Sequence, residues 1–477
     1  MKFLFLYPTT DSFSLDDGEK SFMYAPTLGI LYLSSVLRDN GHEAKVIDIR
    51  GEENPGEAIK NEIRNTDAIG ITVPTFALNN SRKIVGMIRD IDSSIPIVMG
   101  GPHPTLYPHA SLKEINADIA VVGEAENSIL DVTKILEGKQ GAEEGRGVYY
   151  RENDGIHVGK KAEIIDDLNS IPFPAHDLVK KYDYGSSYGF KLFKGKTTAV
   201  LASRGCPRRC SFCSRRLLYM GIYRKRNAEN VVGEIEMLYE RGYENVIIAD
   251  DNFTSDMRKV DTIMDMIMER GIELTLLVNG ARVDSADERV YSKMWDAGVR
   301  LISFGLESGN QEILDFYRKD ITLDQIRRAV DISNKTGFFT IGNFIIGAPI
   351  ETEKEIKNTI KFASSLPLDM AEFFILRYMP GSELWERALK GGKIGEDEYL
   401  VESDCRKGLG NFTREELIHW KNLAYKNFYF RPLYIANELR KFISRFDIRL
   451  IKAGFSMLKI LRYRTKKDEK VWKMLEK

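Results

Sequence analysis

Two successive alternations of short apolar segments and helical patterns most constrain the fold of this 477-residue chain. The first alternation predicts strands at 2–7, 44–49, 68–73, 95–99 and 118–121, separated by helices at 27–40, 55–64, 79–91 and 127–137. This pattern is typical of an α/β parallel sheet with helices on both faces, whose ligands lie at the carboxyl ends of the strands. We therefore expect a Rossmann-like domain over residues 1–140.

The second alternation predicts six strands, at 198–203, 245–250, 273–279, 300–306, 339–346 and 371–377. Each interval between them can hold one helix, so residues 197–380 should form an incomplete parallel (β/α)6 barrel with its chemistry at the carboxyl ends of the strands. Residues 141–196 are rich in glycine and polar residues and contain a hairpin pattern, YYRENDGIHVGKK. We expect a linker with a hairpin there, and a mainly helical region over 381–477.

Composition narrows the class of protein. The chain is 43% hydrophobic and 29% charged, with a formal net charge of -1, so it is globular and has no overall field that attracts nucleic acid. The start, MKFLFLYPTTDSF, is unlike a signal peptide, and no apolar run approaches the roughly 18 residues of a spanning helix. We expect a cytoplasmic protein that binds no nucleic acid.

Three of the four cysteines lie together in SRGCPRRCSFCSRR, at 203–216, directly after the first predicted barrel strand. Three thiolates can bind zinc, another metal ion or a cluster. Structural zinc usually takes four ligands, and the sequence has no second paired motif, while Cys405 stands alone. Three cysteines can instead hold three irons of a [4Fe-4S] cube and leave the fourth iron open for chemistry.

The segment CPRRCSFC resembles the CxxxCxxC signature of radical S-adenosylmethionine (SAM) enzymes. The resemblance implies that Cys206, Cys210 and Cys213 ligate a [4Fe-4S] cluster whose open iron binds SAM. A flavodoxin or ferredoxin type of electron donor would reduce the cluster, and SAM would be cleaved to methionine and a 5'-deoxyadenosyl radical. ADDNFT, GLESG and NFIIGAPIET resemble further motifs of these enzymes. The implied SAM contacts are Phe212, Asp250, Asn252, Glu307, Ser308, Asn343 and Ile345.

The predicted domain order, joined by IPFPAHDL at 171–178, resembles the cobalamin-binding (B12-binding-domain) radical SAM proteins. The loops YPTT, TVPTF, GGPHPT and VVGEAE then imply a cobalamin site. Its implied contacts are Thr9, Thr72, Pro74, Thr75, Gly100, Gly101, His103, Thr105, Gly123 and Glu124. The motif DxHxxG is absent, so we expect no histidine on cobalt; a Rossmann-like domain without cofactor is the alternative. GxGxxG after the first strand and GxxxxGK[ST] are absent too, which argues against a dinucleotide or P-loop site.

The resemblance implies an enzyme that abstracts hydrogen from a substrate carbon and then transfers a methyl group from methylcobalamin, with catalytic residues left open. A radical cyclisation or rearrangement at the same site is one alternative. A non-catalytic iron-sulfur or zinc interaction module is another, and it would leave GLESG and NFIIGAPIET without a purpose.

Residues 431–467 hold eleven lysines and arginines against two acidic residues, interleaved with apolar residues. This amphipathic basic tail admits three interpretations: a helical pair with a solvated face, contact with an anionic membrane surface or acidic substrate, or contact with nucleic acid. The second interpretation would place the protein at the inner face of the membrane. It makes a lipid-like substrate a candidate, with another small molecule as the alternative.

Overall fold

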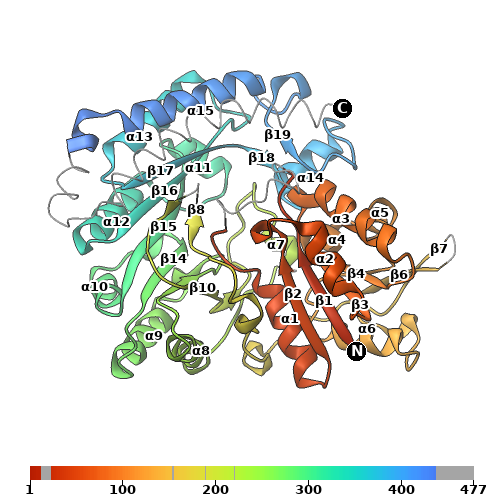
Figure 1. Cartoon of the computed structure of the whole chain (residues 1–477). Coiled ribbons are helices and arrows are strands. Elements are labelled where there is room, and N and C mark those ends of the chain that lie inside the picture. Colours follow the sequence, from red (N-terminus) through yellow and green to blue (C-terminus); the bar gives the residue numbers. More distant parts are fainter. Residues whose placement is uncertain (12–22, 153–154, 188–189, 220, 437–477) are drawn as a thin grey trace. The chain divides into compact units, whose positions relative to one another are not determined.

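The computed structural model describes residues 1–11, 23–152, 155–187, 190–219 and 221–436. The chain divides into two compact units, Met1–Gly189 and Phe190–Lys477 (Figure 1). Each unit has a parallel sheet of its own.

The first unit is built on a seven-stranded sheet in the order β2-β1-β3-β4-β5-β6-β7. Its parallel strands are β1 (Lys2–Tyr7), β2 (Glu43–Asp48), β3 (Ala68–Thr72), β4 (Ile97–Gly100) and β5 (Ile119–Val121). The residues from Phe3 to Leu6 are all buried, as in a strand covered on both faces. The expected Rossmann-like arrangement is confirmed.

Four helices of the first unit lie where the sequence predicts them: α1 (Leu28–Asp39), α2 (Pro55–Ile63), α3 (Leu78–Ile91) and α6 (Ser128–Leu136). Two short helices, α4 (Pro102–Leu106) and α5 (Pro108–Ile115), were not expected, because prolines within GGPHPT and after it suggested a loop. Each helix begins with its proline, where the missing N–H group would have no intrahelical partner. His103 and Thr105 therefore stand on a helix and not on a loop.

A hairpin of β6 (Val148–Glu152) and β7 (Gly155–Val158) extends the first sheet antiparallel to β5. The chain that follows packs on the same unit. Ser35 Oγ donates to the carbonyl of Phe173 at 2.6 Å, and Tyr184 Oη donates to Asp48 Oδ2 at 2.9 Å. Residues up to at least Tyr184 thus belong to the first unit.

The second unit contains six parallel strands in the order β10-β13-β14-β15-β16-β17. They are β10 (Thr197–Val200), β13 (Asn245–Ile248), β14 (Thr275–Ala281), β15 (Val299–Glu307), β16 (Phe339–Ile346) and β17 (Met370–Ile375). Alternate side chains of these strands, such as Val246, Ile248 and Phe344, join one hydrophobic core with the helices. This is the expected incomplete barrel.

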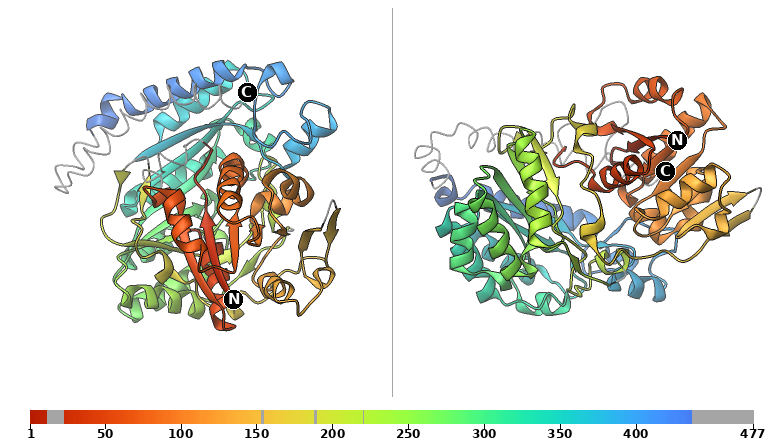
Figure 2. Two further views of the ribbon diagram at one scale, coloured as in Figure 1. Left: turned by 45° about the vertical axis from the view of Figure 1, so that its right-hand side comes forward. Right: turned by 90° about the horizontal axis from the view of Figure 1, so that it is seen from below.

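Helices connect the strands and cover the outer face of this sheet, as the green and teal helices in Figure 2 show. They are α8 (Ala228–Glu240), α9 (Met257–Glu269), α10 (Glu288–Asp296), α12 (Leu323–Thr336) and α13 (Glu353–Ser365). Two intervals differ from the expectation of a single helix, because α7 (Arg215–Leu218) precedes α8 and α11 (Gln311–Phe316) precedes α12. Thr322 and Thr352 begin α12 and α13 with capping boxes, which fix the loops that leave the strands.

Three tyrosines cover the outer edge of β17, the last strand of the incomplete barrel. Tyr425 and Tyr429 lie on α15 (Arg414–Tyr429), which runs along β17 in Figure 1. Tyr425 Oη accepts from the backbone N–H of Phe373 at 3.2 Å, and Tyr429 Oη donates to the Ala371 carbonyl at 3.0 Å. Tyr434 Oη donates to the Asp369 carbonyl at 2.8 Å. The edge's backbone groups are therefore paired without a further strand.

The remaining C-terminal elements are β18 (Arg377–Tyr378), α14 (Glu383–Lys390) and β19 (Val401–Glu402), with β18 and β19 antiparallel. Most of the predicted basic tail, residues 437–467, lies outside the described residues. Within the described part of the chain, no helix combines the length and apolarity needed to span a membrane.

Candidate functional site

The cysteine segment forms a loop between β10 and α8, at the carboxyl edge of the second sheet. Its base is closed by β11 (Ser203–Arg204), which pairs antiparallel with β12 (Arg224–Lys225). Asp250, at the end of β13, accepts a hydrogen bond from the Ala202 N–H at 2.7 Å and another from Ser203 Oγ. Burial raises the pKa of Asp250 to about 6. This predicted SAM contact thus holds the strand that enters the loop.

Further contacts hold the loop from neighbouring strands. Arg215 pairs with Asp251 at 3.2 Å, and Arg208 pairs with Asp284 at 2.9 Å. The Ser211 N–H donates to the Tyr317 carbonyl at 2.9 Å. The loop is therefore fixed by acidic side chains that follow β13 and β14 and by the end of α11, all within the second unit.

The three clustered cysteines are free thiols of intermediate exposure. Burial raises the pKa of Cys213 to about 11 and that of Cys210 above its ordinary value. Asn252 Nδ2 lies 4.0 Å from Cys206 Sγ. Within the described ranges, no three His, Cys, Asp or Glu side chains converge on a single metal ion, whereas in a [4Fe-4S] cluster each of three thiolates binds a different iron.

The donor set fits an iron-sulfur cluster. Three soft sulfur ligands stand on one loop, and they would lose their protons to a bound metal. Buried cations, Arg282 and Lys319, are close enough to influence the Cys210 thiol. An anionic thiolate cluster is favoured beside such charges.

Three predicted SAM contacts line one cavity of about 380 Å³ at the same edge of the sheet: Phe212, Glu307 and Ile345. Phe212 packs edge-on against Tyr317, with ring centroids 5.1 Å apart. The rest of the cavity is lined by Phe373, Phe374, Ile375, Leu376, Arg377, Met379, Glu402 and Lys421. The cavity therefore combines an apolar wall with a charged rim beside the cysteine loop, as binding sites for small molecules do.

The other predicted SAM contacts have partners within the fold. Ser308 is fully buried, and its Oγ hydrogen-bonds Thr359 Oγ1 at 3.1 Å. Asn343 Nδ2 donates to Ser303 Oγ at 2.9 Å. The structure gives Ser308 and Asn343 contacts that order the strand ends, and neither residue lines the cavity.

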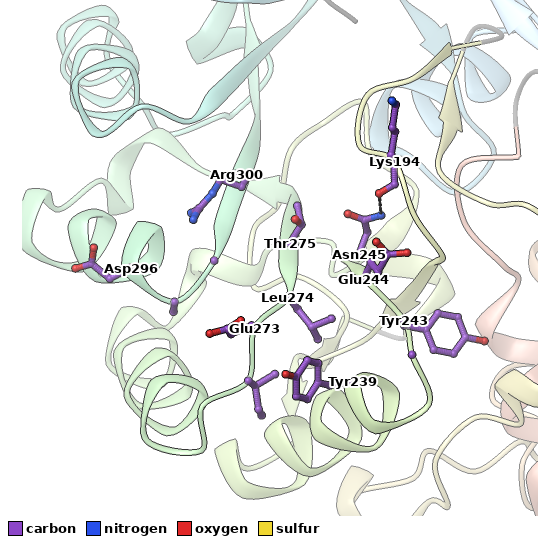
Figure 3. A pocket seen from close by; sticks show the side chains of 14 residues that line it. Lys194, Tyr239, Tyr243, Glu244, Asn245, Glu273, Leu274, Thr275, Asp296 and Arg300 are labelled. Atoms are coloured by element: carbon purple, nitrogen blue, oxygen red, sulfur yellow. Dashed lines mark hydrogen bonds between the residues drawn. The ribbon is translucent and has the colours of Figure 1, made fainter. Parts of the chain in front are cut away.

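A second hollow of about 630 Å³ lies at the amino edge of the same sheet (Figure 3). Two of its polar side chains have partners within the fold. Asn245 Nδ2 donates to the Lys194 carbonyl at 2.8 Å, and the guanidinium of Arg300 stacks over the Trp295 ring at 4.1 Å. We therefore place the candidate chemistry at the opposite edge, with the cysteines.

In the first unit, the predicted cobalamin contacts follow β3, β4 and β5, which are neighbours in the sheet. Thr72 ends β3, and Pro74 and Thr75 follow it; Gly100 ends β4, and Gly101 follows it; Gly123 follows β5. Gly101 has φ +98°, and a Cβ there would be 2.7 Å from Thr72 Oγ1. The N–H of Gly123 donates to Thr105 Oγ1 at 3.1 Å. The structure thus brings these loops together at one edge.

Three other predicted cobalamin contacts are engaged inside the first unit. Thr9 is buried and accepts from Asn80 Nδ2 at 2.9 Å, and Glu124 Oε2 accepts from the Ile165 N–H at 3.0 Å. His103 is fully buried, and burial lowers its pKa to about 4. Burial therefore keeps this enclosed imidazole neutral, and the absence of a histidine on cobalt stays a prediction.

The first-unit edge fits a large ligand through its glycines and its exposed aromatic ring. A side chain at Gly101 would close the gap between the loops after β3 and β4, and Phe76, next to Thr75, is 41% exposed. Glycine at such positions lets a ligand approach the backbone.

Sequence reasoning missed Lys319 and Arg282, which the fold brings to the cysteine loop. Neither stands in a motif, so no local signal marks them. Glu351 was missed as well, although it belongs to NFIIGAPIET. Its Oε2 accepts from the N–H of Gly347 at 2.6 Å, which fixes the turn after β16.

Comparisons with known proteins agree with both halves of the chain. The radical SAM superfamily matches residues 200–363, and the B12 binding domain matches residues 18–133. An uncharacterized methyltransferase of Pyrococcus horikoshii is 32% identical over 87% of this chain and 90% of its own. An anaerobic magnesium-protoporphyrin IX monomethyl ester cyclase of Rubrivivax gelatinosus is 28% identical over 95% of this chain and 83% of its own.

Solved structures share the fold. The radical SAM methyltransferase TsrM from Kitasatospora setae has a TM-score of 0.66, with 19% identity over 81% of this chain and 76% of its own. The cobalamin-dependent radical SAM enzyme OxsB, with aqua-cobalamin and SAM bound, has a TM-score of 0.72, with 16% identity over 97% of this chain and 71% of its own.

The fold and the cysteine loop define a radical SAM enzyme with an N-terminal B12-binding domain. The chain belongs to the family of cobalamin-dependent radical SAM enzymes that contains methyltransferases and anaerobic cyclases. Its cofactors are a [4Fe-4S] cluster, SAM and cobalamin. The expected family, fold class and cofactors are confirmed, whereas the individual site residues and domain limits stay predictions.

Proposed function

We propose that the enzyme is a C-methyltransferase that abstracts a hydrogen atom from a substrate carbon and replaces it with a methyl group. The observation that carries this is the shared position of the cysteine loop and the cavity lined by Phe212, Glu307 and Ile345. When bound, the reduced cluster supplies the electron that cleaves SAM. The P. horikoshii relative, named a methyltransferase, supports methylation over other outcomes.

In this proposal Cys206, Cys210 and Cys213 are the cluster ligands. The side chains of Phe212 and Ile345 contact the apolar faces of the adenosyl group, and the carboxylate of Glu307 accepts hydrogen bonds from SAM. Asp250, Ser308 and Asn343 order the loops around the cavity. Asn252 orients its amide toward the Cys206 thiolate.

The first unit holds cobalamin at the edge formed by the loops after β3, β4 and β5. We assign the backbone of Gly100, Gly101 and Gly123 to the closest approach, because Gly101 leaves no room for a side chain. Thr72 and Thr105 support these glycines. His103 stays enclosed and neutral, and it orders α4 from inside the unit.

Cleavage of SAM tests the catalytic proposal. Anaerobic reconstitution with iron and sulfide, then SAM and a strong reductant, should give 5'-deoxyadenosine. Cys210→Ala removes one of three ligands, so both the absorption of the cluster near ~400 nm and the product should be lost. Cys405→Ala is the matched control, since this exposed cysteine lies outside the cluster motif. A fully loaded cluster that never yields 5'-deoxyadenosine contradicts the proposal.

Product analysis separates methylation from cyclisation, the activity in the name of the R. gelatinosus relative. Methylation consumes one SAM as radical source and a second as methyl donor, so S-adenosylhomocysteine should accompany 5'-deoxyadenosine. Cyclisation yields no S-adenosylhomocysteine. In cells fed methionine labelled in its methyl group, deletion of the gene should remove the label from one product and thereby name the substrate.

We further propose a small acidic electron donor of flavodoxin or ferredoxin type and a lipid-like substrate. The second idea rests on the charge and apolar content of residues 437–467. In a flotation experiment, the whole chain should float with anionic liposomes, whereas a chain that ends at Ala436 should not. This end point keeps Tyr434, which bonds to the Asp369 carbonyl. Equal failure of both chains to float removes the membrane argument.

A further inference from the structure

A buried ion pair lies beside the cysteine loop. Lys319 Nζ is 2.6 Å from Glu307 Oε1, and the two side chains are only 10% and 8% exposed. Burial lowers the pKa of Lys319, but the nearby charges of Glu307 and Cys210 outweigh it, so this pKa lies above its ordinary value. Lys319 therefore carries its positive charge inside the fold.

The backbone around this pair is strained. In the described part of the chain, four residues other than glycine have positive φ, and three of them are Glu307 (61°), Arg318 (50°) and Asp320 (53°). The fourth, Asn116, stands at the end of α5. Left-handed backbone is unfavourable for side chains with a Cβ, and such residues gather at functional sites. The strained residues thus include Glu307 itself and both chain neighbours of Lys319, which are Arg318 and Asp320.

Gly305 leaves the space that the pair occupies. A Cβ on Gly305 would lie 2.6 Å from Glu307 Oε1 and 2.9 Å from Lys319 Nζ. The φ of Gly305 is not in the left-handed region, so the backbone itself does not require glycine here. The ion pair instead fills the space that a side chain at Gly305 would take, so such a side chain would displace it.

Backbone hydrogen bonds hold the cysteine loop against the segment that carries Lys319. The N–H of Ser211, next to Cys210, donates to the Tyr317 carbonyl at 2.9 Å, and Ser211 Oγ donates to the Phe316 carbonyl at 3.2 Å. A second buried cation supports the lysine, because Arg282 Nη2 donates to the Lys319 carbonyl at 2.7 Å. Two buried cations thus stand on and beside the segment that is bonded to the cysteine loop.

We propose that Lys319, held in place by Glu307, sets the reduction potential of the cluster. This inference rests on the proposed ligands Cys206, Cys210 and Cys213. One added electron makes a thiolate-ligated cluster more negative, and a buried cation stabilises that reduced form because the interior screens charge weakly. The lysine therefore makes the cluster easier to reduce.

The test is a redox titration of the reconstituted whole enzyme without SAM, followed by electron paramagnetic resonance. Lys319→Met should move the midpoint potential to a more negative value. Glu307→Gln should move it to a less negative value, because the anionic cluster keeps the released lysine protonated. Lys319→Arg retains the charge, so its midpoint potential should stay close to that of the wild type.

Two further variants separate the charge from general damage. Gly305→Ala displaces the pair without changing any charge, so it too should move the potential. Lys357→Met is the matched control, because Lys357 pairs with Glu353 at 2.8 Å on an exposed face of α13, with 61% and 62% exposure. Solvent screens this exposed pair, so Lys357→Met should cause no shift of the midpoint potential.

The inference is decided by whether Lys319→Met and Glu307→Gln shift the midpoint potential in opposite directions. If Lys319→Met and Glu307→Gln leave the potential unchanged, or move it in the same direction, Lys319 does not set it. If Lys319→Met fails to hold a cluster, the inference is decided by the sign for Glu307→Gln and by whether Lys319→Arg keeps the wild-type potential. A wild-type enzyme that binds no cluster refutes the proposed ligands instead.

Discussion

Individual buried carboxyl groups show how this enzyme orders its strand ends. Glu351 is fully buried, and its Oε2 accepts from the N–H groups of Gly347 and Ala348 at 2.6 and 3.2 Å. Its Oε1 is buried and has no hydrogen-bond partner. Burial raises the pKa of Glu351 from 4.5 to about 7, so the group binds a proton more tightly when folded than when unfolded.

This shift predicts a pH-dependent stability of the second unit. Because the folded pKa exceeds the unfolded one, the favourable contribution is complete below pH ~4.5 and is lost as the pH rises through ~7. Glu351→Gln keeps an acceptor oxygen and cannot ionise, so it should match the wild type at pH ~5. Above pH ~8 it should be more stable by up to about 3 kcal/mol.

Thermal unfolding of the cofactor-free protein across this pH range measures the effect. Glu355→Gln is the control on the same helix region, since burial is slight there and the pKa of Glu355 is lowered, chiefly by its hydrogen bond to Thr352. A Glu351→Gln variant that tracks the wild type at every pH would show that Glu351 ionises freely in the folded state.

At the scale of elements, the sequence predicts strands well and misses features that depend on distant parts of the chain. β15 and β16 fall within a residue or two of their expected limits, because their apolar runs are long and bounded by polar residues. The helices α4 and α5 were missed because proline at a helix start looks like proline in a loop. The two-residue strands β11 and β12 were missed, since pairs this short carry no periodicity.

The tyrosines that cover β17 predict a protected sheet edge. Replacing Tyr425, Tyr429 and Tyr434 by phenylalanine removes only three hydroxyl groups, each worth about 1 kcal/mol of net hydrogen bonding. The N–H groups of Ala371 and Phe373 then lose their phenolic acceptors. We expect faster amide hydrogen exchange in the peptide 369–375 and a greater tendency to aggregate through the open edge.

A single exposed tyrosine gives the matched control. Tyr239 lies on α8 and is 39% exposed, so Tyr239→Phe should leave exchange in the peptide 369–375 unchanged. Unaltered exchange in the triple variant would mean that the packing of the α15 rings, without their hydroxyl groups, protects β17.

For the whole molecule, the sequence predicts the two-part organisation and the cysteine ligand set, but it does not locate the charges around that set. Cys206, Cys210 and Cys213 are close in sequence, so their spacing alone indicates a shared site. Lys319 and Glu307 meet only because α11 turns the chain back toward the end of β15. Likewise, Asp250 meets the chain that follows β10 because it follows β13, the neighbour of β10 in the sheet. No local pattern encodes which strands are neighbours.

The division into two units predicts which activity a single unit keeps. Every contact described above for the cysteine loop comes from residues after Phe190, and the second unit has its own sheet and core. A chain of residues 190–477 should therefore assemble the cluster and cleave SAM, with Cys210→Ala in the same piece as control. It lacks the proposed cobalamin loops, so it should release 5'-deoxyadenosine without S-adenosylhomocysteine. If this piece is folded by circular dichroism yet assembles no cluster, the first unit contributes to the cluster site, and cluster assembly and methyl transfer are then functions of the joined units.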